Sequence, residues 1–115
     1  MDNRLPKATW QQKLRSWFGP RKLWPLAVTG DSMVPLIRDG DVVLYEPKPK
    51  VVSGDILFVA HPYMQSVKLV KRVREIDAGG NLFLIGDNEA ESTDSRTLGW
   101  FSPDSVQGRI ICRLR

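Results

Sequence analysis

The chain has 115 residues, of which 42% are hydrophobic and 26% are charged, and its formal net charge is +4 at pH 7. This length allows one domain with a modest core, and this composition is typical of a globular protein rather than a disordered one. The single cysteine, Cys112, excludes an intrachain disulfide and, between apolar neighbours, indicates a small core residue. No cluster of Cys and His has the spacing of a zinc site.

The excess positive charge is concentrated near the N-terminus. Residues 1–30 hold six Lys or Arg and one Asp, whereas residues 31–115 hold eleven basic and twelve acidic residues. Three of the four tryptophans also lie in the first part: Trp10, Trp17 and Trp24. We therefore divide the chain into a basic, Trp-rich segment, residues 1–25, and a domain, residues 26–115.

The stretch TWQQKLRSWF, residues 9–18, predicts a short amphipathic helix. Thr9 and Gln12 have the spacing of a capping box, and Gly19-Pro20 ends the pattern. Apolar residues follow the cap at helical intervals: Trp10, Leu14, Trp17 and Phe18. Two interpretations stay open, a helix docked on the domain or frayed, and a weak membrane-surface contact with cations on the polar face. Nucleic-acid binding is not expected, because one short helix is no helix-turn-helix and the domain has no basic stripe.

Apolar runs in the sequence are too short to cross a bilayer. WPLAV, residues 24–28, is among the longest, whereas a spanning helix needs roughly 18 apolar residues. No h-region precedes a small-residue cleavage site either. The sequence therefore predicts neither a membrane anchor nor a cleavable signal, and a cytoplasmic location with at most peripheral membrane contact.

Beyond residue 28, short β-type runs alternate with turn residues. The runs are DVVLYE, DILFVAH, VKLVKRV, NLFLIGD and GRIICRLR. DAGGN, residues 77–81, favours a hairpin between the third and fourth runs, because glycine accepts positive φ. A long loop, residues 86–105, precedes the last run, and we expect its own polar contacts to order it. The pattern predicts a mainly β domain with a coiled or barrel-like sheet.

The stretch GDSMVPLIRDGD, residues 30–41, places a hydroxyl among glycines, aspartates and a proline. Turn chemistry explains these residues and leaves Ser32 as either a turn residue or a nucleophile. A serine attacks a carbonyl only when a base removes its proton. The only histidine, His61, stands beside Pro62, where we expect an ordinary surface residue rather than a catalytic base.

Strand alternation favours a lysine as that base. In VKLVKRV, residues 67–73, Lys71 shares one face with the apolar residues Val67, Leu69 and Val73. The opposite face carries charges that we expect to be solvated: Lys68, Arg72 and Arg74. Burial disfavours the ammonium form, so a buried Lys71 can be neutral near pH 7 and accept a proton from a serine. A β-bulge or a snorkelling side chain would instead return it to solvent.

Three stretches together resemble the sequence boxes of type I signal peptidases. GDSMVPLIRDGDVVL is similar to the nucleophile box, VKRV to the catalytic-lysine box, and GDNEAESTDSRTLGWFSPDSVQGR to the last box. The boxes occur in the family's order and cover about residues 26–110. The resemblance implies a coiled, partly open β-barrel of the signal-peptidase and LexA catalytic-core type.

The resemblance also implies roles for individual residues. Ser32 is implied as the nucleophile and Lys71 as the general base of a Ser-Lys dyad, with the Ser32 N–H as one oxyanion donor. Many members carry a second donor, a serine hydroxyl, at the position of Gly30, which leaves Thr29 or another backbone N–H for that role. Supporting roles are implied for the remaining residues: Met33 and Pro35 shape the site, Ser92 orients the lysine amine, and Asp94 and Arg96 form an ion pair. Without the resemblance, these loop residues would be ordinary turn formers and surface contacts.

Two departures point to a small branch of the family. Signal peptidases have N-terminal spanning helices, whereas this sequence predicts none. They also generally carry a second β-region after the lysine box, whereas residues 76–81 here form only a tight turn. The chain therefore most resembles the nickel-type superoxide dismutase maturation proteases. This implies a serine endopeptidase that binds the superoxide dismutase precursor as an extended strand, removes its leader, and needs no metal or other cofactor.

Three alternatives remain for the function. The first is a general leader peptidase at a membrane. The second is a self-cleaving regulator like the LexA-type repressors, although the only Ala-Gly pair, Ala78-Gly79, lies downstream of Ser32. The third is a binding module whose β-domain is catalytically silent and whose Trp-rich segment makes the functional contact.

Overall fold

The computed structural model describes residues 5–15 and 22–115. Its first helix, α1 (Trp10–Arg15), begins where the capping box predicts it. Gln12 N donates to Thr9 Oγ1 over 3.2 Å and Thr9 N donates to Gln12 Oε1 over 2.8 Å, so both groups of the capping box are paired. The rest of the predicted helix, with Trp17 and Phe18, lies outside the described residues.

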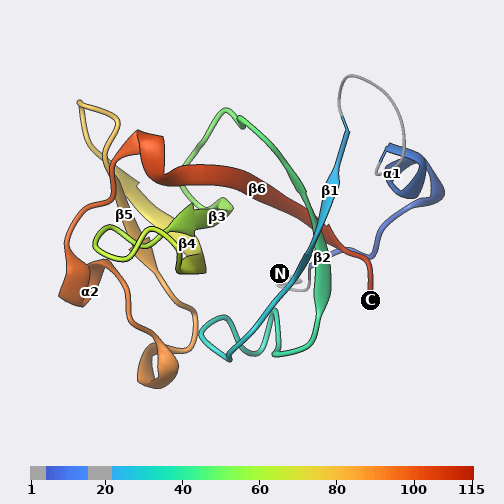
Figure 1. Ribbon diagram of the computed structural model, residues 1–115, viewed down its shortest axis with the longest axis horizontal. Helices are drawn as coiled ribbons and strands as arrows, with labels where there is room; N and C mark the ends of the chain where they lie inside the picture. The colour runs from blue at the N-terminus through green and yellow to red at the C-terminus, as the bar shows by residue number, and fades with distance from the viewer. Residues whose placement is uncertain (1–4, 16–21) are drawn as a thin grey trace.

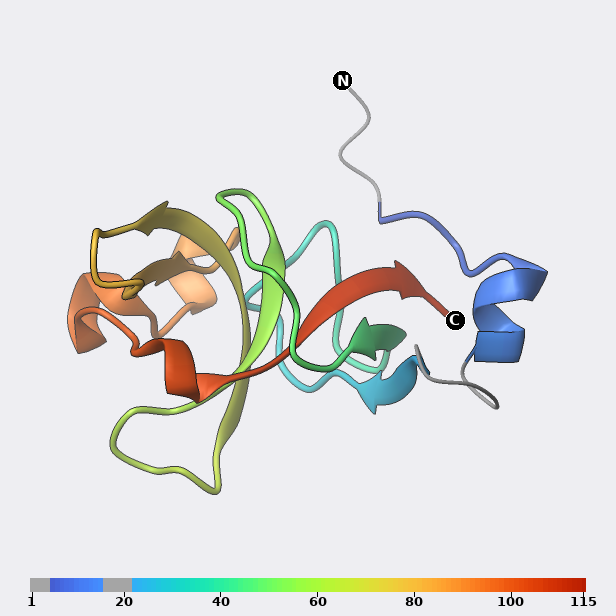
Figure 2. The same cartoon turned by 90° about the horizontal axis from the view of Figure 1, so that it is seen from above.

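The chain before α1 is docked on the domain. Ala8 N donates to Arg113 O and Arg113 N donates to Pro6 O, and Leu5 is buried in the largest apolar cluster. Both views show α1 close to the C-terminal end of the last strand (Figure 1, Figure 2). A membrane-surface role for this segment stays a prediction, as does the functional boundary at residue 25.

Six antiparallel strands form one sheet in the order β1-β2-β6-β3-β4-β5. Their bounds are β1 (Trp24–Ala27), β2 (Val42–Glu46), β3 (Ile56–Ala60), β4 (Lys68–Ile76), β5 (Leu82–Ile85) and β6 (Val106–Arg113). Among the described strands β1 and β5 are the two edges, so the sheet is not closed. The predicted mainly β fold and its five strands are confirmed, and β1 was not foreseen.

The sheet is strongly bent around the central strand β6. In Figure 1, β6 runs from the half formed by β3, β4 and β5 to the half formed by β1 and β2. The pairing register shifts between Leu44 and Tyr45 on β2 and between Phe58 and Val59 on β3. Such irregularities increase local twist, and they let β6 serve both halves.

The connections match the turn chemistry of the sequence. Asp77 Oδ1 accepts hydrogen bonds from Gly79 N and Asn81 N, which closes the predicted β4–β5 hairpin. The long loop after β5 contains three short helical pieces: η1 (Glu89–Glu91), α2 (Ser95–Leu98) and η2 (Pro103–Ser105). Asp94 caps α2 by accepting from Arg96 N, and Ser95 Oγ accepts from Leu84 N, so polar contacts order this loop as predicted. In the described part of the chain, no helix has the length and apolar character needed to cross a membrane.

Candidate active site

Ser32 lies at the start of a turn that follows β1. Its neighbour Met33 is 2% exposed and packs, with the fully buried Ile37, in the largest apolar cluster. Met33 O accepts hydrogen bonds from Leu36 N and Ile37 N, which gives the turn a helical character. The turn is therefore fixed to the core by its buried residues Met33 and Ile37, while Ser32 itself is half-buried.

The same turn is held from the other side by the loop after β5. Asn88 N donates to Ser32 O over 2.8 Å, and Asn88 Nδ2 donates to Asp31 O over 3.0 Å. Asp87 N also contacts the sulfur of Met33 at 3.4 Å. Residues far apart in sequence thus fix the backbone around Ser32.

Gly30 and Pro35 occupy the exposed parts of this turn. Gly30 has φ +83°, a conformation that favours glycine, and its N–H donates to Asp39 Oδ1 over 2.8 Å. That N–H is therefore already used within the turn. Thr29 is exposed, and its role as the second oxyanion donor stays a prediction.

Lys71 lies on β4 and is 2% exposed, between the partly buried Leu69 and the buried Val73. The burial predicted from strand alternation is confirmed. Its Nζ donates to Ser92 Oγ over 3.0 Å, and Ser92 Oγ donates in turn to Asp94 Oδ2 over 2.8 Å. The structure thus joins three of the predicted site residues in one hydrogen-bonded chain.

The surroundings of Lys71 favour its neutral amine. Burial lowers the pKa of Lys71 below its usual value of 10.5; Asp94 opposes this shift, and the positive charge of Arg96 adds to it. A buried amine with a lowered pKa, oriented by a hydroxyl, has the properties of a general base.

Asp94 is the most heavily hydrogen-bonded side chain of the site and is 1% exposed. Its two oxygens accept from Gly86 N, Ser92 Oγ, and the backbone N, Nε and Nη2 of Arg96. Burial alone would raise the pKa of Asp94, but hydrogen bonds from Arg96, Gly86 and Ser92 hold it well below its usual range. Asp94 therefore stays ionised and ties the lysine chain to Arg96, which also pairs with the exposed Glu89.

Gly86 connects Ser32 with the lysine chain, and we did not single it out from the sequence. A Cβ at Gly86 would lie 2.1 Å from Ser92 Oγ and 2.8 Å from Ser32 O. Both groups therefore flank the same point, which places the Ser32 turn beside the chain of Lys71, Ser92 and Asp94. The glycine of the quoted GDN motif was the available signal.

Gly86→Ala is expected to lower the free energy of unfolding by about 1–3 kcal/mol, because the added methyl group has no room. Gly79→Ala is the matched control, since a Cβ there meets its nearest atoms at an ordinary 3.5 Å. Urea unfolding of both variants measures the difference. Equal stability of Gly86→Ala and wild type would show that Ser32 and Ser92 do not pack against each other through this glycine.

No hydrogen bond joins the Ser32 hydroxyl to Lys71 Nζ in the described part of the chain. Hydrogen bonds between catalytic groups are often long in unliganded enzymes and shorten when substrate binds. The dyad roles of Ser32 and Lys71 therefore stay predictions, supported by the way Gly86, Asn88 and Ser92 bring the two residues to one place.

Two expectations for polar side chains were wrong. Arg72 is not simply solvated: its Nε and Nη2 donate to both oxygens of Asp87, and its Nη1 donates to Gly54 O. His61 is not a surface residue but is 7% exposed, because its Nδ1 accepts from Tyr63 N and Met64 N and so closes the turn after β3. His61 therefore has a local structural role that explains its burial.

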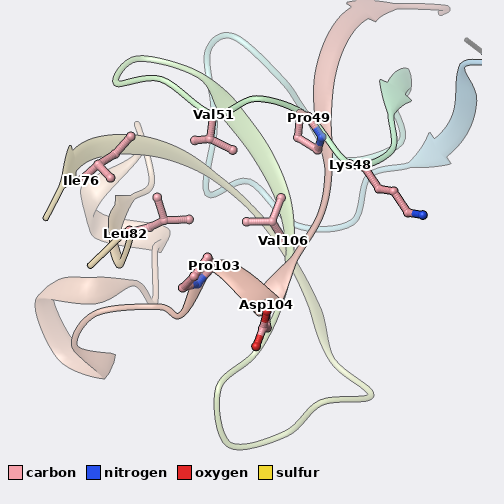
Figure 3. Close-up of a pocket in the computed structure, with 9 residues that line it drawn as sticks. Lys48, Pro49, Val51, Ile76, Leu82, Pro103, Asp104 and Val106 are labelled. Atoms are coloured by element: carbon pink, nitrogen blue, oxygen red, sulfur yellow. The ribbon is translucent and has the colours of Figure 1, made fainter. Parts of the chain in front are cut away.

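A separate cavity of about 510 Å³ lies at the far end of β4 from Lys68, next to the β4–β5 turn (Figure 3). Its apolar lining comes from the segment after β2, the β4–β5 hairpin, η2 and the start of β6: Pro49, Val51, Ile76, Leu82, Pro103 and Val106. None of the predicted site residues lines it.

Comparisons with known proteins identify a relative of this chain and the family to which it belongs. The chain is 30% identical to mitochondrial inner membrane protease subunit 1 of Xenopus tropicalis, in a match that covers 75% of this chain. The chain spans 65% of the length of that relative. The family described as Peptidase S24-like matches residues 7–111, which is nearly the whole chain. The protein therefore belongs to the Peptidase S24-like family.

Proposed function

We propose that the protein is a serine endopeptidase that removes an N-terminal leader from a precursor protein, with Ser32 as nucleophile and Lys71 as general base. Membership of a peptidase family and the identity to a protease subunit support hydrolysis of a peptide bond. The observation that carries the proposal is the buried Lys71 amine, whose pKa is lowered mainly by burial, beside the Ser32 turn.

In the proposed mechanism, neutral Lys71 takes the proton from Ser32 Oγ as this oxygen attacks the scissile carbonyl carbon. The C–N bond of the tetrahedral intermediate then breaks, and the leaving amine takes the proton from Lys71 Nζ. A water molecule, deprotonated by the Lys71 amine, then hydrolyses the ester on Ser32 and regenerates the Ser32 hydroxyl and the neutral Lys71. Ser92 keeps the amine oriented through both steps, and the Ser32 N–H stabilises the developing oxyanion.

The substrate is proposed to bind as an extended strand. β1 is an edge of the sheet and leads directly into the Ser32 turn, so its outer edge offers backbone groups for an added strand. Main-chain pairing would fix the peptide, and side-chain pockets would select the sequence. Tyr63 and Met64, both exposed, are proposed to form part of the wall of the site.

The precursor of a nickel-type superoxide dismutase is the proposed substrate. The short β4–β5 turn, closed by Asp77, supports this branch of the family, because larger leader peptidases carry an inserted region there. The self-cleaving alternative gains no support, since Ala78-Gly79 lies in this hydrogen-bonded turn. Genomic proximity to a reading frame for that dismutase, with an N-terminal extension, would support the assignment further.

Cleavage of a synthetic peptide that spans the leader junction tests the proposed function. Wild type and Ser66→Ala, which alters an exposed serine in the β3–β4 turn, are expected to cut it at one bond, whereas Ser32→Ala leaves it intact. Cleavage of unrelated leader peptides at the same rate would instead indicate a general leader peptidase. An uncut peptide, with every leader sequence intact, would refute the proposal.

The pH dependence of cleavage follows from the state of Lys71. The amine accepts a proton only when neutral, so kcat/KM is expected to rise with pH and level off above the pKa of Lys71. Because burial lowers this pKa, the midpoint is expected below 10.5. Measurement of kcat/KM from pH 5 to pH 10 checks this, and a rate that falls with pH across the range would exclude an amine as the base.

A further inference from the structure

Asn88 contacts the backbone on both sides of the Ser32 Cα atom. Its side-chain Nδ2 donates to Asp31 O over 3.0 Å, and its backbone N donates to Ser32 O over 2.8 Å. The first contact crosses from the loop after β5 to the turn after β1, a separation of 57 residues in sequence. No other residue in the described chain donates side-chain hydrogen bonds to this turn's carbonyls.

The contact to Asp31 O fixes the direction of the Ser32 N–H. The peptide bond between Asp31 and Ser32 is trans, so its C=O and its N–H point in opposite directions. With Asp31 O turned toward Asn88 Nδ2, the Ser32 N–H points away from Asn88. Among residues 5–15 and 22–115 no group accepts a hydrogen bond from this N–H, so it is available to a ligand.

The same contact also strengthens that donor. A hydrogen bond accepted by a peptide carbonyl polarises the peptide unit and makes its N–H a better donor. Asp31 O additionally accepts from Val34 N over 3.2 Å, which acts in the same direction. The Ser32 peptide is thus oriented and polarised before any substrate arrives.

We infer that Asn88 is the positioning residue of the oxyanion site, because its side-chain amide orients the Asp31–Ser32 peptide whose N–H binds the developing oxyanion. This inference rests on the proposed function and deepens it. Gly30 supplies no hydroxyl and its N–H is bound to Asp39. Stabilisation of the developing oxyanion therefore depends more on the orientation of the Ser32 N–H here.

A fluorophosphonate probe tests the inference without knowledge of the natural substrate. Ser32 Oγ forms a bond to phosphorus, fluoride leaves, and the serine proton passes to Lys71, while the phosphoryl oxygen occupies the oxyanion position. Asn88→Ala and the isosteric Asn88→Asp are each expected to label at least about tenfold more slowly than wild type. Asn81→Ala is the matched control, because it removes a similar amide contact, to Asp77 Oδ2, in the β4–β5 turn.

The pH profile of labelling separates positioning from a loss of structure. In both Asn88 variants the plateau rate is expected to fall, and in the uncharged Asn88→Ala variant the midpoint, set by Lys71, is expected to stay at its wild-type pH. A loosened site that admits water would move the midpoint of Asn88→Ala upward, and that result would overturn the inference. So would labelling of Asn88→Ala and Asn88→Asp at the wild-type rate. A wild-type protein that the probe does not label at Ser32 would instead refute the proposed function itself.

Discussion

Lys71→Met is expected to abolish peptide-bond cleavage and, at the same time, to make the fold more stable. Loss of the proposed base should lower kcat/KM by about 10⁴-fold or more, as is found when one member of a coupled nucleophile and base is removed. Methionine nearly matches the size of lysine without an amine to desolvate, so the free energy of unfolding at pH 7 should rise by about 1 kcal/mol.

The stability gain should depend on pH. The pKa of Lys71 is lower in the folded chain than in the unfolded chain, so the unfolded chain binds more protons between the two values. Wild type therefore loses stability as the pH falls from 10.5 toward the lowered pKa, whereas Lys71→Met does not. Thermal unfolding at pH 7 and at pH 10 measures this difference.

Lys68→Met is the matched control for this prediction, because Lys68 lies on the same strand but is exposed. It should leave both cleavage and stability near the wild-type values. Cleavage that survives in Lys71→Met would remove lysine from the mechanism, and a lower stability of that variant would show that the buried amine contributes favourably to the fold.

Asp94→Ala is expected to lower the free energy of unfolding by about 3–5 kcal/mol, the largest loss of any single change in this site. The substitution leaves the Gly86 N–H and the Ser92 hydroxyl without their acceptor and removes the anion that Arg96 binds. Because Asp94 has a lowered pKa, its contribution is present above the usual value of 3.8 and is lost only as the pH falls through the lowered pKa.

Urea unfolding at pH 7 measures this loss, and Asp104→Ala provides the control because Asp104 is exposed. The control should change stability by less than about 0.5 kcal/mol. Cleavage should also fall in Asp94→Ala, since Ser92 loses the partner that fixes its hydroxyl. A loss as small as that of the control would show that Asp94 does not organise the loop.

The strands and their turns were predictable because alternation and turn residues are local properties of the sequence. β1 escaped detection because Trp24–Ala27 is short and contains Pro25, and its pairing with β2 is a tertiary feature. Lys71 was located by strand parity together with the resemblance of VKRV to a catalytic-lysine box, and it lies on the buried face of β4 with Val73.

Other features of the site depend on contacts that no local pattern encodes. His61 is buried because its ring closes the turn that follows it, which the neighbouring proline does not reveal. The close approach at Gly86 and the hydrogen bond from Asn88 to Asp31 O form only when the loop after β5 packs against the Ser32 turn. A motif can draw attention to such residues, but only the folded chain shows what they touch.

The most direct test of the account is to map the acyl group that the peptide substrate leaves on the enzyme. Wild type, mixed with the precursor peptide and quenched in acid within seconds, is digested with trypsin and examined by tandem mass spectrometry. The account predicts an acyl group on Ser32, in the tryptic peptide of residues 23–38, and none in Lys71→Met. An acyl group on another residue, or one on Ser32 that forms as fast in Lys71→Met, would contradict it.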